Sequence, residues 1–303
     1  MSGRKKAQKT MQIVLHAGVH ATDSDRLLKT LLRNRDGLRP EGIGLPGPGK
    51  YRKLISETLN TLGALEPAVG ARDVLIDAVL DDDVGHVDRL ILSHDNVFSV
   101  PKIAFQGGVI YRKAEQRLQS LRRMFAEDSF ELFLSVRNPA TFLPALLAAT
   151  PHAELSDLLK GVNPADVRWS DFVARLTDAV PDVPITVWCD EDSPLVWGEI
   201  LREMAALPPA YPLIGAYSRM AEITTKEGMS RFRSYLAERP DLTEIQIRRV
   251  MVAFLDKYAD DSKLEDELDI PGWTDEYVSG LTEQYEDDIF ELARLPGVTM
   301  IAP

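Results

Sequence analysis

The chain has 303 residues, of which 45% are hydrophobic and 27% are charged, so it is long enough for one large domain or two modest ones with a substantial core. Its formal net charge of −12 argues against a general nucleic-acid binder and a binder of anionic membranes, because both need a basic face. The single cysteine, Cys189, excludes an intrachain disulfide framework and a thiolate metal cluster. The five histidines show no metal-ligand spacing, and we predict no metal site.

The chain begins with a basic segment, "MSGRKKAQKT", that no long apolar segment follows. The run "MQIVLHAGV" is too short for a signal-peptide core with a cleavage site and too short to span a bilayer. We therefore expect residues 1–10 to form a mobile tail and the protein to be cytoplasmic, with no membrane partner.

The first predicted element is a buried strand, "MQIVLHAG" (Met11–Gly18), which is short, apolar and ended by glycine. Four leucines at helical spacing between positions 27 and 32 predict a helix directly after it. The next stretch, "GLRPEGIGLPGPGKYR", is dense in glycine and proline and predicts a loop with little regular structure.

The middle of the chain alternates predicted helices and strands. In chain order we predict helices near Arg52–Leu65 and Ala71–Leu80, a strand at Arg89–Ser93, a helix over "RKAEQRLQSLRRMF", and a strand from "FELFLSV" to Arg137. A helix over "ATFLPALLAA", a strand over "VPITVWC" and a further helix follow, with Ser193 as the predicted N-cap and Pro194 as the first helical residue. After about Leu207 the pattern is helical and acidic, which predicts that 207–303 form a helical cap or an extension of the domain.

Buried strands that alternate with helices indicate an α/β fold, a parallel sheet flanked by helices, over residues 11–206. In such sheets ligands bind beyond the carboxyl ends of the strands. The polar groups at those ends are therefore the first candidates for a site: His16–Asp25, Ser93–Asn96, Arg137–Asn138 and Asp190–Ser193.

Several of these segments together resemble the sulfotransferase-like P-loop family of the bacterial type. "HAGVHATDSDRLL" is similar to its first loop, "LSVRNPATFLPALL" to its Arg-Asn/Asp-Pro motif, "LILSHDN" to its strand-end Ser-x-Glu-Asn, and "ITVWCDEDSPLVW" to its fourth strand. The order and spacing of the motifs carry the resemblance, which spans roughly residues 11–204, and the closing "LPGVTMIAP" is a candidate extension of it.

The resemblance implies a P-loop NTPase-like, sulfotransferase-type sheet with a helical C-terminal part. It also implies transfer of a sulfuryl group from 3′-phosphoadenosine 5′-phosphosulfate to a hydroxyl or amine of an unidentified small acceptor. Such a reaction needs backbone amides and a lysine to hold the transferring group, and a base to take the acceptor proton.

The first loop matches the family motif at four positions, namely Gly18, His20, Thr22 and Ser24. It departs from the motif where Ala21 stands in place of the lysine, Asp23 in place of a small residue and Asp25 in place of a hydroxyl. We therefore predict that the loop geometry is kept while its charge chemistry is lost. The two aspartates are predicted to act as built-in anions that cap the following helix and occupy the phosphate cradle.

Other positions complete the predicted donor site. Arg137 matches the arginine that holds the 3′-phosphate, whereas Ala145 stands where its serine partner should be. Lys50 and Arg52 are candidate auxiliary cations, and Ser93 and Asp95 are candidate crevice residues. We expect Arg137 to lie across a crevice from the loop, and the first strand to lie inside the sheet.

Each candidate also has a plainer interpretation. His20 is a candidate general base, because its ordinary pKa suits proton transfer, or a structural histidine. The string Ser93-His94-Asp95 resembles a hydrolase triad, but adjacent strand-end residues point alternately and do not form a relay. Cys189 is predicted to be a core thiol.

Three functions remain open from the sequence. The first is a sulfotransferase with a rearranged and impaired anion site, and the second is a non-catalytic, diverged P-loop protein that acts as a binding or interaction module. The third, a nucleotide-dependent kinase, is disfavoured because no G-x-x-x-x-G-K-[ST] motif is present. The sequence does not specify the acceptor or the oligomeric state.

Overall fold

A single all-parallel sheet of six strands organises the chain, in the order β2-β3-β1-β4-β5-β6. The computed structural model describes residues 9–263 and 270–303, so most of the predicted tail, residues 1–8, lies outside the described residues. The strands are β1 (Gln12–His16), β2 (Ile43–Gly44), β3 (Arg89–Ser93), β4 (Ser129–Val136), β5 (Ile185–Cys189) and β6 (Val298–Ile301).

The first strand lies inside the sheet, as predicted, with β3 on one side and β4 on the other. Its Val14 is in register with Ile91 of β3 and Glu131 of β4. The chain leaves β1 toward one edge, returns through β3 and then crosses to β4 on the far side of β1. The strand order therefore reverses next to β1, and ligands of open α/β sheets bind at such a point.

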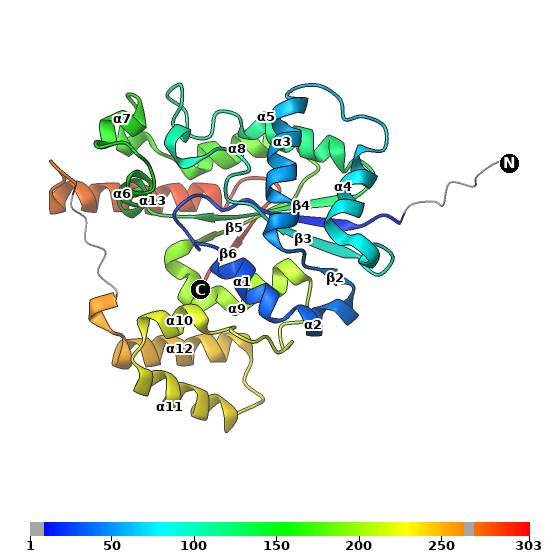
Figure 1. Cartoon of the computed structure of the whole chain (residues 1–303). Helices are drawn as coiled ribbons and strands as arrows, with labels where there is room; N and C mark the ends of the chain where they lie inside the picture. The colour runs from blue at the N-terminus through cyan, green and yellow to red at the C-terminus, as the bar shows by residue number, and fades with distance from the viewer. Residues whose placement is uncertain (1–8, 264–269) are drawn as a thin grey trace.

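Helices cover both faces of the sheet, which explains why the strands are continuous apolar runs. The helices are α1 (Arg26–Arg33), α2 (Arg35–Leu38), α3 (Arg52–Leu62), α4 (Ala71–Leu80), α5 (Ala114–Met124), α6 (Pro139–Ala148), α7 (Leu155–Leu159), α8 (Trp169–Ala179), α9 (Ser193–Ala205), α10 (Ser218–Ile223), α11 (Lys226–Ala237), α12 (Glu244–Tyr258) and α13 (Asp275–Leu292). Figure 1 shows α3, α4, α5 and α8 on one side of the sheet and α1, α2 and α9 on the other.

Two hydrophobic cores lie on the two faces of the sheet. Ile13 and Leu15 of β1 belong to the larger core, with side chains of α3, α5 and α8. Val14 points the other way and packs in a second core with α1 and α9. This is the two-residue alternation of a strand, which sends successive side chains to opposite faces of the sheet.

The helices α10, α11 and α12 form a separate layer beyond α9 (Figure 1). They share a small core of their own, which is built from Met220, Met229, Phe232 and Met251. We call α10–α12 the helical cap. The rest of the predicted C-terminal part is different, because α13 packs on α8 and α6, and β6 extends the main sheet.

Three local predictions are corrected by the structure. The glycine-rich stretch after α2 contains the two-residue strand β2, and the C-terminal region contains β6, so 207–303 is not wholly helical. Both strands are edge strands too short to show a clear apolar pattern. Helix α9 begins at Ser193 itself, with Asp192 in the N-cap position, so the predicted N-cap is displaced by one residue.

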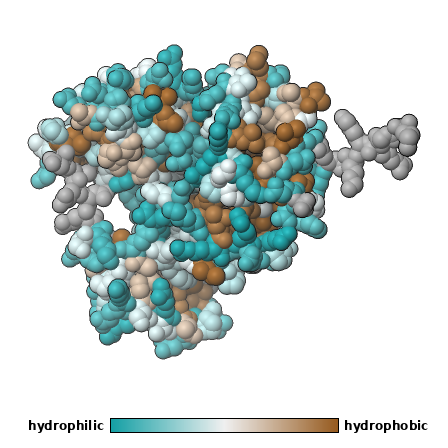
Figure 2. All heavy atoms as spheres, viewed as in Figure 1, coloured by the Kyte–Doolittle hydropathy of each residue, from teal (hydrophilic) through white to brown (hydrophobic). Residues whose placement is uncertain are grey.

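The surface seen in Figure 2 is mainly hydrophilic, with hydrophobic side chains in separate patches. Among the described residues, exposed apolar side chains include Leu65, Val69 and Val74, close to one another in the sequence around the start of α4. None of the helices in the described part of the chain is both long and apolar enough to cross a membrane.

Helix α13 is joined to α8 by a buried carboxylate. Asp288 is 2% exposed and accepts hydrogen bonds from the backbone nitrogens of Trp169 and Ser170, at 2.6 and 3.3 Å from Oδ2. Its Oδ1 also pairs with Arg168 Nε at 3.2 Å. The side chain thus caps the N-terminus of α8 from another helix, which supplies a partner for amides that have none within α8.

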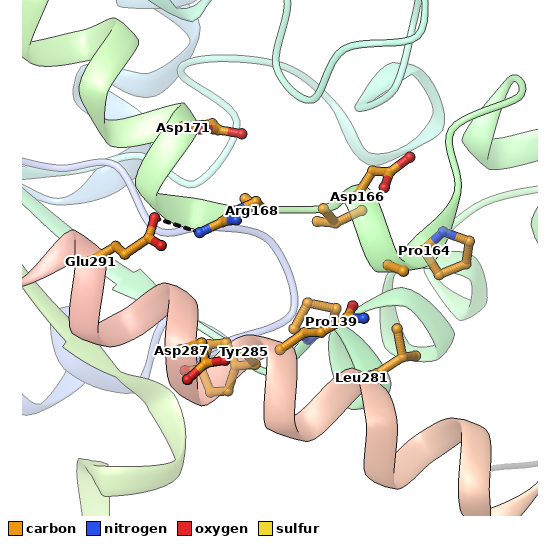
Figure 3. A pocket seen from close by; sticks show the side chains of 12 residues that line it. Pro139, Pro164, Asp166, Arg168, Asp171, Leu281, Tyr285, Asp287 and Glu291 are labelled. Carbon is orange, nitrogen blue, oxygen red and sulfur yellow. Dashed lines mark hydrogen bonds and ion pairs between the residues drawn. The ribbon is translucent and has the colours of Figure 1, made fainter.

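A hollow of about 480 Å³ lies beside this junction. Figure 3 shows Arg168, the residue before α8, extending toward Glu291 of α13, with Asp166, Asp171 and Asp287 around the opening. The hollow lies between helices and away from the strand-end loops, except for its contact with Pro139. None of the predicted site residues lines it.

Candidate functional site

An open crevice lies at the carboxyl ends of the strands, where the strand order predicts a ligand site. It has a volume of about 980 Å³, and it is bounded by loops that follow β1, β3, β4 and β5, by α10 of the helical cap and by Lys263. The individually predicted residues His20, Thr22, Ser24, Asp95 and Arg137 line it, and so do Asp190 and Glu191 of the predicted segment after β5. The crevice therefore brings together candidates from the ends of four strands.

The loop between β1 and α1, residues 17–25, forms one wall of this crevice. Gly18 has a φ of +66°, a backbone conformation that glycine adopts without strain, and it lies beside Asp95 of the neighbouring strand-end loop. Ala21, Ser24 and Asp25 also adopt positive φ, which makes the loop tightly coiled. The Thr22 hydroxyl donates to Val19 O at 2.8 Å and holds the turn together.

Arg137 contacts the loop directly. Its Nη1 donates to Ala21 O at 2.7 Å, and its Nε donates to the Thr141 hydroxyl at 2.9 Å. Arg137 was expected to lie across the crevice from the loop; it lines the same crevice but is bonded directly to the loop, because the carboxyl ends of β1 and β4 are adjacent. Ala145 and Thr141 both line the crevice, and the Thr141 hydroxyl is a neighbour of Arg137 one turn before Ala145 on α6.

The two loop aspartates have different roles. Asp23 is 5% exposed, and its carboxylate accepts a hydrogen bond from Leu27 N at 2.9 Å, so it caps α1 as predicted. Asp25 occupies the N-cap position but makes no side-chain cap, and this part of the prediction is wrong. Its carboxylate instead forms a two-point ion pair with Arg52, with Nη2 to Oδ1 at 2.5 Å and Nη1 to Oδ2 at 3.2 Å.

The two candidate auxiliary cations, Lys50 and Arg52, lie in different places. Arg52 reaches the loop, because its Nε donates to Ser93 O at 2.8 Å while its other nitrogens hold Asp25. Lys50 pairs with Asp81 and lines a different hollow, so it does not join the crevice. Lys50 lies in the short turn before α3, near the edge strand β2, and this position keeps it away from the crevice.

The Ser93-His94-Asp95 string does not form a relay, as predicted. The Ser93 hydroxyl contacts His16 Nδ1 at 3.0 Å, whereas His94 Nε2 contacts the Ser56 hydroxyl at 2.9 Å. His16 also stacks on Trp188 with ring centroids 5.7 Å apart, and burial lowers its pKa. These contacts favour a structural histidine at the end of β1, packed across β4 against Trp188 of β5.

His20 is hydrogen-bonded through both ring nitrogens. The Tyr111 hydroxyl accepts from His20 N at 3.2 Å and lies 2.9 Å from Nδ1, so it donates to that nitrogen. Nε2 lies 3.1 Å from Ser99 O, and therefore carries the proton. Burial lowers the pKa of His20, which keeps the ring neutral. The contacts favour a structural histidine, and the general-base role stays a prediction that requires release of Tyr111.

The lowered pKa values of His16 and His20 predict a loss of stability in mild acid. The unfolded chain gains protons on these rings as the pH falls below 6.5, whereas the folded chain resists protonation, so the free energy of unfolding decreases through that range. Denaturant unfolding between about pH 7.5 and about pH 5.5 should show the decrease, and His20→Gln should reduce it.

The matched control for this prediction is His86→Gln, at an exposed position outside the crevice. It should keep the pH dependence of the wild-type protein. An equal pH dependence in His20→Gln and the wild type would show that His20 is not held neutral.

A chain of charged side chains crosses the crevice from β5 to α1, and the sequence reasoning missed most of it. Asp190, at the end of β5, lies 3.6 Å from Arg219 Nη2 of α10. Arg219 pairs at 2.6 Å with Glu222, which in turn pairs with Arg26 at 3.1 Å. Burial raises the pKa of Asp190 to about 6, and Arg219 opposes this shift. Asp190 was among the strand-end candidates, but no local pattern points to Arg219.

Glu191, the acidic residue next to Asp190, supports a turn of this edge. Glu191 accepts a hydrogen bond from Asn138 N at 2.8 Å and another from the Tyr285 hydroxyl at 3.1 Å, so α13 supports the Arg137-Asn138 turn.

Cys189 is a buried thiol, as predicted, and burial raises its pKa to about 12. Within the part of the chain that the structure describes, no group of three or more histidine, cysteine or acidic side chains is arranged to hold a metal ion.

Comparison with known proteins gives no family for this chain: no family model, no curated protein and no solved structure matches it.

Proposed function

We propose that this chain is a non-catalytic, diverged relative of sulfotransferase-like P-loop proteins, and that it binds a small polar ligand in the crevice. The observation that carries the proposal is the hydrogen bond from Leu27 N to the Asp23 carboxylate. A phosphate or sulfate group at a helix N-terminus needs such free amides. Here a carboxylate of the chain itself takes this position at α1.

The charge balance of the crevice supports the same proposal. Its wall carries four cationic and four acidic side chains, namely Arg26, Arg137, Arg219 and Lys263 against Asp95, Asp190, Glu191 and Glu222. A donor such as 3′-phosphoadenosine 5′-phosphosulfate carries several negative charges and needs a net positive field. A wall with equal numbers of positive and negative side chains is better suited to a neutral or zwitterionic ligand.

Sulfuryl transfer remains the second candidate, because one specific observation favours it. Arg137 contacts the loop at Ala21 O, and Arg52 lies at its other end beside Asp25. A ligand that drew Arg52 away from Asp25 would face two guanidinium groups. In that case the missing loop lysine would be replaced by an arginine from α3.

Calorimetry distinguishes the two candidates. We expect no binding heat with 3′,5′-adenosine bisphosphate, ATP or inorganic sulfate at concentrations up to about 1 mM. A thermal-shift panel of amino acids, betaines and sugars should contain the stabilising compounds, and Arg219→Gln should reduce their effect because Arg219 crosses the crevice. Micromolar binding of the bisphosphate by the wild-type protein would overturn the non-catalytic proposal and favour the second candidate, sulfuryl transfer.

A further inference from the structure

A smaller hollow lies on the other side of the His20 wall, between α3, the segment 96–106 and the start of α5. Its volume is about 320 Å³. Asn96 and Ser99 line it and also contact His20 Nε2, so these residues separate it from the crevice. We call it the α3–α5 pocket.

The charged side chains that line the α3–α5 pocket are all cationic: Arg112, Lys113 and Arg117. This is unusual for a chain with a net charge of −12. Within residues 9–263 and 270–303, no ion pair joins any of the three to a carboxylate. The pocket therefore has a local positive charge that the described chain does not neutralise.

Arg117 shows the consequence most clearly. Its Nη1 donates to Val97 O at 2.7 Å and its Nη2 donates to Asn60 Oδ1 at 2.7 Å, and both acceptors are neutral. Burial lowers the pKa of Arg117, because the half-buried charge has no carboxylate beside it. These two bonds hold the guanidinium in place at the pocket wall, where a bound anion would compensate its charge.

The remainder of the lining is apolar or uncharged. Phe98, Val100 and Ile103 form an apolar side, and Val100 and Ile103 are 39% and 42% exposed. Ser56, Asn60 and Gln106 add uncharged polar groups. A volume near the lower limit of ligand sites selects a compact molecule with one charged end and one short apolar end.

We propose that the α3–α5 pocket binds a small organic phosphate or sulfate ester, with its anionic group on Arg112, Lys113 and Arg117 and its apolar group against Phe98, Val100 and Ile103. This site is separate from the crevice and independent of the function proposed there. Bidentate contacts from arginine suit the oxygen geometry of both anions.

The test is calorimetry with phenyl phosphate and phenyl sulfate, compared with inorganic phosphate and phenol. At least one ester should bind more tightly than both inorganic phosphate and phenol. Arg117→Gln should weaken that binding by at least about tenfold, because it removes the fixed charge. Lys113→Gln, at an exposed position at the pocket, should weaken it several-fold and serves as the second variant if Arg117→Gln does not fold.

Two controls locate the binding. Arg122→Gln alters a guanidinium of the same helix that pairs with Asp182 outside the pocket, and it should leave ester binding unchanged. Arg137→Gln alters the crevice and should also leave it unchanged. The proposal is overturned if neither ester binds, if Arg117→Gln and Lys113→Gln bind the esters as the wild type does, if inorganic phosphate binds as tightly as both esters, or if Arg137→Gln abolishes ester binding.

Discussion

The triple variant Ala21→Lys, Asp23→Gly, Asp25→Thr should bind 3′,5′-adenosine bisphosphate at least about tenfold more tightly than the wild-type protein. A carboxylate about 4 Å from a phosphate costs roughly 4 kcal/mol at an effective dielectric near 20, and a third of that is already about tenfold in affinity. The variant removes two such charges and adds one lysine. It also frees Arg52, which in the wild type is held by Asp25.

The same variant should be less stable, by at least about 1 kcal/mol, because α1 loses the cap that Asp23 provides at Leu27 N. Its threonine at position 25 also takes a positive φ, which strains a β-branched residue, and Arg52 loses its ion-pair partner. Calorimetry gives the affinity, and denaturant unfolding gives the stability. Asp36→Asn is the matched control, since it removes an exposed carboxylate of the neighbouring helix α2 and should change neither quantity. No gain in affinity in the triple variant would mean that the aspartates are not what prevents donor binding.

Asp288→Ala should lower the free energy of unfolding by about 3 kcal/mol. The substitution leaves the backbone nitrogens of Trp169 and Ser170 without the carboxylate that they bond. The Asp288 side chain is buried, with 2% of its surface exposed, so water does not easily replace it. Among the described residues, the substitution also leaves Arg168 with Glu291 as its remaining ion-pair partner. Because Asp288 joins α13 to α8, the loss should weaken the docking of the C-terminal helix as a whole.

Urea unfolding of Asp288→Ala and of Asp287→Ala tests this expectation. Asp287 is the exposed neighbour on the same helix, and its loss should cost less than about 0.5 kcal/mol. Equal effects of the two substitutions would show that the buried carboxylate does not stabilise the junction. Asp288→Asn should fall between them, since an amide oxygen still accepts one of the hydrogen bonds.

The sequence is sufficient to predict those features that depend on the pattern of neighbouring residues. The alternation of apolar runs and helical periods predicts the parallel sheet, because a strand covered on both faces must be apolar throughout. The meeting of Arg137 with the β1–α1 loop also follows from the sequence, since parallel strands release their carboxyl ends at one edge. The capping role of Asp23 was also predicted from the sequence, because free amides at a helix N-terminus attract a nearby carboxylate.

Charge partners, by contrast, depend on distances between segments that the sequence leaves open. Asp25 was expected to cap α1, but Arg52 is close enough in the folded chain to form an ion pair with it instead. Tyr111, which holds His20, and Arg219, which crosses the crevice, come from segments with no motif of their own.

The sequence by itself therefore determined the α/β class and the edge at which the loops gather, while the order of the family-like motifs led to the expectation of an inner first strand. Only the tertiary structure decided that β2 and β6 extend the sheet, that the cap contributes Arg219 to the crevice, and that three cations gather in the α3–α5 pocket. The physical reason is that periodicity is a property of neighbouring residues, whereas hydrogen bonds and ion pairs are selected by proximity after the chain has folded.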